Sequence, residues 1–193
     1  MKLYQILDER ATVHRVNNES EADYLQNVTD LLADKLGISD REITVNFNPP
    51  QELLKKLGDR KFQGATIGLN NSPDKIFVLI NQHLSTGEKV ATLSHEMVHA
   101  KQMADGRLAM MLSKDGSVHM EWEGESFEFK GYSNSAPWEI EATTQEKSLR
   151  QFVIDNIRKA CTCAVGYMQL RFNPASTFLL FSEEVLCTAR SWN

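Results

Sequence analysis

The sequence predicts an α+β fold, and the periodicity of its apolar residues carries this prediction. Apolar residues recur at helical spacing in three segments, which are residues 22–36, 86–103 and 137–157. Between these segments, Glu42–Phe47 and Val118–Trp122 alternate apolar and polar residues, as half-buried strands do. The resulting order is helix, strands, long helix, hairpin, long helix. Runs of strands followed by helices favour an α+β architecture.

The first half of the chain is predicted to hold one long helix and three strands. Ser20 is expected to cap a helix from Ala22 to Leu36, which Gly37 ends. The elements expected after it are a strand at Glu42–Phe47, a short helix at Gln51–Leu57 after Pro49 and Pro50, and strands at Ala65–Leu69 and Lys75–Asn81 with a turn at Asn70–Pro73 between them.

The second half is predicted to hold a hairpin between two long helices. The first of these helices begins at Ser85 or Thr86, is supported by Glu88 in its first turn, and ends near Met103 before Gly106. The elements expected after it are a hairpin of Val118–Trp122 and Phe127–Phe129, and a helix that Asn134 or Ser135 caps, with Pro137 in its first turn, reaching Ile157. Residues 161–193 form a C-terminal extension for which an extra strand and helix or a loose tail both remain open.

Composition and charge narrow the class of protein. The chain has 193 residues, of which 41% are hydrophobic and 24% charged, as in ordinary globular proteins. We therefore expect a single domain over residues 1–193 with its core at about residues 20–160. A formal net charge of −5 argues against nucleic acid or an anionic membrane as the main partner. We find neither an apolar run long enough to span a membrane nor a secretion signal, so we expect a cytoplasmic protein. The oligomeric state stays open.

The strongest signal for chemistry lies in the predicted helix 86–103, where His95-Glu96-Met97-Val98-His99 has the pattern H-E-x-x-H. Residues four apart lie one above the other on a helix, so His95 and His99 can hold one metal ion between two imidazoles. Both histidines fall on nearly the opposite side of the helix from its apolar stripe. Glu96 is rotated by about 100° from His95 and can act on a metal-bound water without being a ligand.

A catalytic zinc site usually has a third protein ligand. His83 and His119 are candidates, as are Glu139 and Glu141 at the start of the last helix. Measured from the stripe of Trp138 and Ala142, the two glutamates project to opposite flanks by similar angles, so periodicity leaves both open. If both are helical, only one can face the metal.

The motif and the segment after it resemble the gluzincin group of zinc metallopeptidases. In several branches of that group the third ligand opens a pattern Glu-x-x-Ala, which Glu139-Ile140-Glu141-Ala142 matches, whereas Thr143 departs from the acidic or amide residue expected next. The segment from His95 through Trp122-Glu123-Gly124 to Ala142 also resembles small zincin-like proteins of phages and bacteria. The similarity covers roughly residues 75–145. Gln102 and Asp105 stand where a metzincin has Gly and His, which excludes that variant.

The resemblance implies a zincin-like fold, with a small mixed sheet, an active-site helix and a second helix that carries the third ligand. It favours Glu139 over Glu141 as that ligand and Tyr132 as the residue that stabilises the oxyanion, with His119 as second choice. Lys75–Asn81, directly before the H-E-x-x-H helix, resembles the edge strand on which gluzincins bind an extended peptide.

The sequence thus predicts a zinc-dependent metallopeptidase. His95, His99 and Glu139 would bind Zn²⁺, and Glu96 would activate the zinc-bound water and hand its proton to the leaving amine. The substrate would be a peptide or a protein. The alternative is a zincin-like metal-binding module that regulates or interacts without catalysis.

Overall fold

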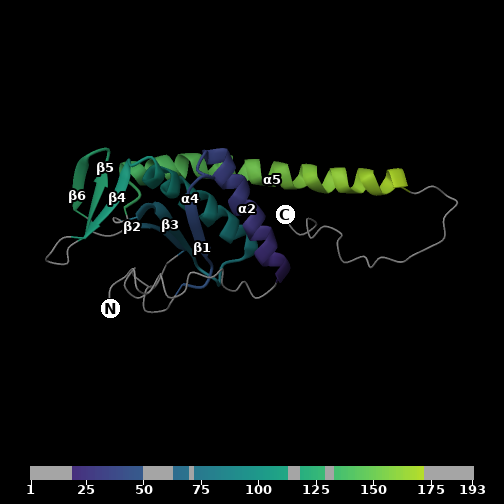
Figure 1. Ribbon diagram of the computed structural model, residues 1–193, viewed down its shortest axis with the longest axis horizontal. Coiled ribbons are helices and arrows are strands. Elements are labelled where there is room, and N and C mark those ends of the chain that lie inside the picture. Colours follow the sequence, from purple (N-terminus) through teal and green to yellow (C-terminus); the bar gives the residue numbers. More distant parts are fainter. Residues whose placement is uncertain (1–18, 50–62, 70–71, 113–117, 129–132, 172–193) are drawn as a thin grey trace. The chain divides into compact units, whose positions relative to one another are not determined.

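The computed structural model describes residues 19–49, 63–69, 72–112, 118–128 and 133–171 (Figure 1). Within these residues the fold is mixed α+β, with three helices and two three-stranded sheets, so the predicted α+β class is confirmed. The elements in chain order are α2 (Glu19–Leu36), β1 (Glu42–Asn46), β2 (Gly64–Leu69), β3 (Ser72–Ile80), α4 (Thr86–Ala104), β4 (Leu108–Leu112), β5 (Val118–Trp122), β6 (Glu125–Glu128) and α5 (Pro137–Arg171).

The first sheet has the strand order β1-β3-β2. Strand β3 pairs with β1 in parallel, opposing Ile43 to Ile76, and with β2 in antiparallel fashion, opposing Thr66 to Val78. Strand β3 is therefore central, and the expectation that Lys75–Asn81 forms an edge strand is wrong. The run Ile76–Ile80 is apolar at every position, which is typical of a strand buried on both faces and agrees with a central place in the sheet. Among the described strands of this sheet, β1 and β2 lie at the edges.

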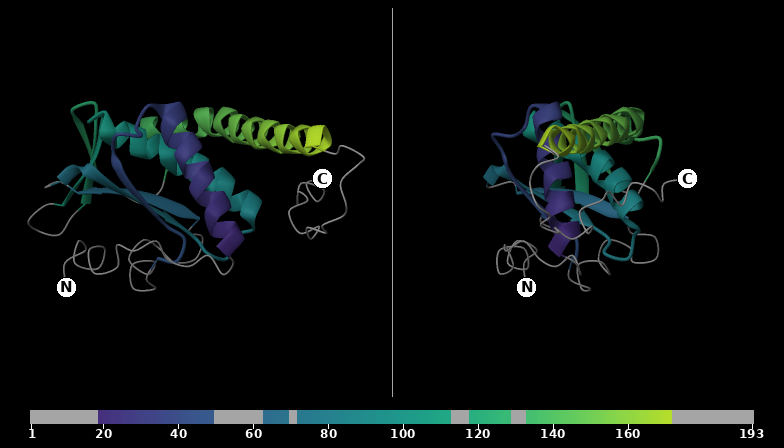
Figure 2. Two further views of the ribbon diagram at one scale, coloured as in Figure 1. Left: turned by 45° about the vertical axis from the view of Figure 1, so that its right-hand side comes forward. Right: turned by 90° about the vertical axis from the view of Figure 1, so that its right-hand side faces the viewer.

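Helix α4 packs on strands β3 and β2 of this sheet, and α2 packs against α4 (Figures 1 and 2). The core between them includes Val78 and Leu93, both fully buried. Polar contacts join the two helices at their edge, where the buried ammonium of Lys89 and the hydroxyl of Thr86 both reach Oε1 of Glu21, at 3.0 and 2.7 Å. The sheet and α2 together hold α4 from two sides.

The second sheet is antiparallel, with the order β4-β5-β6. It contains the predicted hairpin, whose two strands are joined at Glu123 and Gly124, both with positive φ. Strand β4 has no counterpart among the predictions, because its run of consecutive apolar residues has no period that distinguishes strand from helix. Four buried residues form a core cluster between this sheet and the start of α5: Leu108, Met120, Trp122 and Trp138.

Several predicted boundaries shift. Helix α2 begins at Glu19, so Ser20 lies inside it and is not its cap. Strand β3 begins at Ser72, three residues before Lys75, which removes Ser72 and Pro73 from the predicted turn. The predicted helix at Gln51–Leu57 and the strand position Phe129 lie outside the described residues. Helix α5 continues to Arg171, so the first part of the C-terminal extension is helical.

The chain divides into two compact units, residues 1–151 and 152–193, with the division inside α5. All site residues described below belong to the first unit. Of the helices that the structure describes, none combines the length and the apolar character that crossing a membrane requires.

Candidate metal centre

Local sequence determines where the motif helix begins and which face it buries. The Ser85 hydroxyl accepts a hydrogen bond from the Glu88 amide, and the Glu88 carboxylate accepts one from the Ser85 amide. This capping box makes Ser85 the N-cap and confirms that Glu88 supports the first turn. The expected apolar stripe is buried in the core, with Leu93 and Met97 fully enclosed. The two histidines lie on another face of α4. That face is also covered, because His99 is only 7% exposed.

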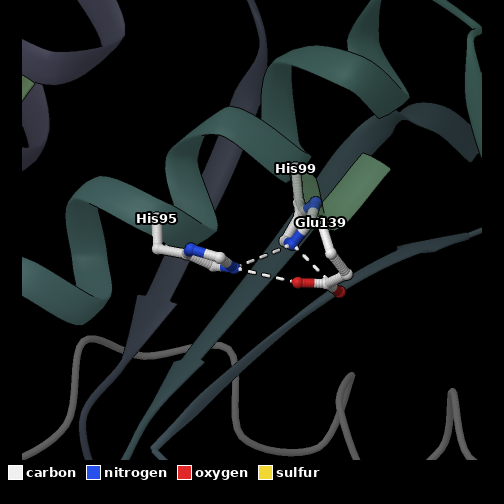
Figure 3. A group of neighbouring side chains, drawn as sticks. All are labelled: His95, His99 and Glu139. Carbon is white, nitrogen blue, oxygen red and sulfur yellow. Dashed lines mark hydrogen bonds and ion pairs between the residues drawn. The ribbon is translucent and has the colours of Figure 1, made fainter. Parts of the chain in front are cut away.

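His95, His99 and Glu139 converge on one point between α4 and the first turn of α5 (Figure 3). The Nε2 atom of His95 lies 3.2 Å from Nε2 of His99 and 3.2 Å from Oε2 of Glu139. The Nε2 atom of His99 lies 3.5 Å from Oε1 of Glu139. The two imidazole rings are nearly perpendicular, with an interplanar angle of 79°. Three donor groups from two helices thus face one another at close range.

These three groups fit a divalent metal ion. Tetrahedral zinc holds nitrogen and oxygen ligands at about 2.0–2.2 Å, so its ligand atoms lie about 3.3–3.5 Å from one another. The two Nε2 atoms lie 3.2 Å apart, while Glu139 faces His95 with Oε2 and His99 with Oε1. With one ligand atom taken from each residue, all three atoms lie within 4.8 Å of one another, close enough for one ion to bind between them. Two imidazoles and a carboxylate are also a donor set that suits zinc among the divalent metals. The buried group could therefore hold a metal ion with three protein ligands.

Arg107 accounts for the different positions of Glu139 and Glu141. Its guanidinium forms a two-pronged ion pair with Glu141, at 3.0 and 2.8 Å, and also binds Glu123 at 2.7 Å. The same guanidinium lies 4.5 Å above the ring of Trp122. Glu141 is thus engaged on the flank away from the histidines, and the structure brings Glu139 to them.

Trp138 anchors the turn of α5 that carries Glu139. Its indole is buried in the cluster of the second sheet, 6.3 Å from the ring of Trp122 and 5.5 Å from the ring of Phe127. Consecutive helical residues are rotated by about 100° from one another, so the packing of Trp138 fixes the direction in which Glu139 projects. The second sheet supports the third candidate ligand in this way.

Glu96 lies beside the cluster and is held by strand β2. The Thr66 hydroxyl lies 2.8 Å from Oε2 of Glu96 and 2.9 Å from its backbone oxygen. Gly64 leaves the space for this carboxylate, since a Cβ at Gly64 would come within 2.9 Å of Glu96 Cγ. Burial raises the pKa of Glu96 above its usual value, although His99 and the Thr66 hydrogen bond act in the opposite direction.

Both histidines have a second partner behind the cluster, and the sequence analysis missed both. Nδ1 of His95 lies 3.3 Å from Oε2 of Glu146, two turns after Glu139 on α5. Nδ1 of His99 lies 2.8 Å from Oε1 of Gln102. Thr143 stands where the gluzincin pattern has an acidic or amide residue. In this chain an acidic partner for His95 is supplied instead by Glu146, seven residues after Glu139. Helical spacing could have suggested Glu146, because residues seven apart share one face.

Burial and pairing act against each other in the electrostatics of the cluster. Burial disfavours the charged forms of His95 and His99, but their contacts with Glu139 and the nearby charge of Glu96 outweigh it, and the pKa of both imidazoles rises. Burial also opposes ionisation of Glu139, yet the two histidines lower its pKa to about 2. Glu139 is therefore an ionised carboxylate facing two imidazoles.

The other candidates are not brought to this centre. His83 is exposed in the turn before α4, with its ring 3.3 Å from the Gln82 amide. His119 lies on β5, paired with Met111 and Glu128, and is not in the ligand group found among the described residues. Tyr132 lies outside the described residues.

We compared the chain with protein-family models, with curated proteins and with solved structures, and none of them matches it.

Proposed function

We propose that the protein is a zinc-dependent peptidase of the zincin type. The observation that supports this most is the convergence of His95, His99 and Glu139, whose ligand atoms, one from each residue, all lie within 4.8 Å of one another. The H-E-x-x-H motif supplies two of these three donors from one helix face. The cluster includes three protein ligands among the described residues, which is the usual number for a catalytic site, whereas a structural site is closed by four.

Each residue has a role in the proposed reaction. His95, His99 and Glu139 would hold Zn²⁺. The ion would polarise a carbonyl oxygen and lower the pKa of a bound water to about 7. Glu96 is a buried carboxylate beside the cluster, and it would take the proton from the attacking water and pass it to the leaving amine. Tyr132 is proposed as the residue that stabilises the oxyanion, on its resemblance to the gluzincins.

The edge of the first sheet is the proposed place for an extended substrate. Strand β2 is at an edge among the described strands and carries both Gly64 and Thr66, which contact Glu96. Pairing a peptide with a strand edge uses backbone hydrogen bonds and so tolerates many side chains. This proposal moves the substrate strand from Lys75–Asn81 to Gly64–Leu69.

Metal analysis tests the centre. We expect the purified protein to bind one zinc ion and the variants His95→Ala and Glu139→Gln to lose it. Glu125→Gln is the matched control, because it makes the same change at an exposed position of β6 that lies outside the ligand group. Stoichiometric zinc in the Glu139→Gln variant would contradict the proposed ligand set.

Hydrolysis of a fluorogenic peptide mixture tests catalysis. We expect Glu96→Gln to retain zinc and to lose peptide hydrolysis by a factor of about 10² or more. Full activity in this variant would contradict the role of Glu96. A wild-type protein that holds zinc and cleaves no peptide of the mixture would favour the alternative, a metal-binding module without catalysis.

A further inference from the structure

Gln102 is a fully buried amide that lies between the two helices of the metal centre. It is one turn after His99 on α4. Its Oε1 atom lies 2.8 Å from Nδ1 of His99, and its Nε2 atom lies 3.1 Å from the backbone oxygen of Trp138. Trp138 directly precedes Glu139. One side chain therefore contacts a candidate ligand on α4 and the backbone next to the candidate ligand on α5.

The Trp138 contact decides which way the amide points. A backbone oxygen can only accept a hydrogen bond, so the NH₂ group of Gln102 must face it. The amide oxygen of Gln102 then faces His99, where it too can only accept. The hydrogen bond at 2.8 Å consequently requires a proton on Nδ1 of His99. In the neutral imidazole this leaves a lone pair on Nε2, the atom that faces His95 and Glu139.

We infer that Gln102 is a positioning residue that holds His99 in the Nδ1–H tautomer and ties the backbone before Glu139 to the same helix. This inference rests on the proposed metal centre, because the tautomer matters when Nε2 is a metal ligand. The partners of metal-bound histidines fix the tautomer and the ring orientation, and losing one typically costs about 10- to 100-fold in metal affinity.

The two histidines differ in how they are held. His95 has the carboxylate of Glu146 at Nδ1, and that side chain is about one third exposed, at 34%. His99 has a neutral amide that is enclosed completely. A charged partner at a solvent-accessible position can be replaced by water, whereas a buried amide cannot. We therefore expect the loss of Gln102 to affect the centre more than the loss of Glu146.

The first test uses the metal-free wild-type protein. Nitrogen-15 NMR of the imidazole rings, at a pH above their titration, distinguishes the two neutral tautomers. We expect His99 to show a proton on Nδ1 and none on Nε2. A proton on Nε2 would overturn the inference, whether or not the protein binds zinc. This readout therefore separates the failure of this inference from the failure of the proposed function.

The second test compares zinc affinities by competition with a chromophoric chelator. Gln102→Leu removes both hydrogen bonds at similar volume, and we expect zinc affinity to fall about 10- to 100-fold. Thr29→Val is the control, since it removes another buried hydrogen bond, from Thr29 to the Leu25 oxygen in α2. Equal affinities of Gln102→Leu and the wild type, or equal losses in both variants, would overturn the inference.

Gln102→Glu keeps the test decisive if the leucine variant does not fold. Its carboxylate preserves an acceptor for Nδ1 of His99 and loses the donor to Trp138. We expect this variant to retain the Nδ1–H tautomer of His99 and to bind zinc less tightly than the wild type. The Nε2–H tautomer in this variant would contradict the inference, as would unchanged affinity for zinc.

Discussion

The two sheets of the protein support different parts of the candidate site. The first sheet holds Glu96, through the Thr66 hydroxyl and the space that Gly64 leaves on strand β2. The second sheet holds Glu139, through the burial of Trp138 and the ion pairs of Arg107. The proposed base and the third proposed ligand thus depend on separate packing. Changes in one sheet should impair hydrolysis with the metal retained, and changes in the other should impair metal binding.

The largest effect is expected for the second sheet, in the variant Trp138→Ala. Removing a buried tryptophan costs about 3–5 kcal/mol of unfolding free energy, and here it also releases the turn that carries Glu139. We expect zinc affinity and the thermal unfolding midpoint to fall together. Leu149→Ala is the control, because Leu149 is also buried on α5. If both variants lower stability and zinc affinity alike, the second sheet has no specific role at the centre.

A smaller effect is expected for Gly64→Ala in the first sheet, and here peptide hydrolysis should fall while zinc binding is retained. The added methyl would lie 2.6 Å from Thr92 Cγ2 and 2.9 Å from Glu96 Cγ, so the proposed base must move. We expect peptide hydrolysis to fall by about 10²-fold, the usual contribution of a general base, at unchanged zinc content. Gly68→Ala on the same strand is the control, since among the described residues its methyl would meet Met103 Sδ alone, at 3.3 Å. Equal activity in the two variants would show that strand β2 does not position Glu96.

Thr66→Val tests whether the first sheet positions Glu96, because it removes the hydroxyl that binds the Glu96 carboxylate. A hydrogen bond to a charged group contributes about 1.5–3 kcal/mol, so we expect activity to fall by roughly 10-fold or more. Thr66→Ser retains the hydroxyl and should recover most of the activity. Zinc content, measured on the same samples, should stay at the wild-type level in both variants.

The smallest effect is expected from pH, acting on the metal-free protein. The folded-state pKa values of His95 and His99 lie above 6.5, so their stabilising contribution is complete below that pH and disappears as pH rises through the raised values. The contribution of Glu139, whose pKa falls from 4.5 to about 2, is complete above pH 4.5 and disappears as pH falls toward 2. Folding also raises the pKa of the Glu96 carboxyl. Ionisation of this group at a pH above 4.5 therefore lowers the free energy of unfolding, as deprotonation of the histidines does.

We therefore expect the unfolding midpoint of the metal-free protein to decrease as the pH rises above 6.5. Zinc requires unprotonated imidazoles, so the stabilisation that zinc adds should grow over the same range. Both series can be measured by thermal unfolding, one in chelator and one in excess zinc. A metal-free midpoint that rises with pH would contradict the assigned pairing of the histidines with Glu139.

Local patterns were sufficient for those features that depend on neighbours along the chain. The capping box of Ser85 and Glu88 lies within four residues, and the histidines are related by a single helical turn. Helical spacing likewise separated the apolar stripe of α4 from His95 and His99. Such relations depend on backbone geometry that every α-helix shares, so they can be read without knowing what the helix packs against.

Pairing between distant segments could not be read in this way. The sequence analysis predicted strand β3 but not its central place, and the apolar run of β4 had no period at all. Thr66 and Glu146 lie on other elements than the histidine or base they contact, and Gln102 appeared only as the residue that excludes a metzincin. Helical spacing places Glu146 on the face of Glu139 and Gln102 one turn after His99, but only the tertiary structure shows that these side chains and Thr66 contact the histidines and Glu96.

The sequence by itself determined the pair of histidines, because two imidazoles four residues apart on a helix must lie on one face. The tertiary structure alone decided which glutamate joins them. Glu139 and Glu141 are equivalent by helical angle; the burial of Trp138 fixes the stripe between them, and Arg107 breaks the equivalence by pairing with Glu141. The physical reason is that a helix fixes angles between its own residues, whereas its rotation against a neighbour is set by the side chains packed between them.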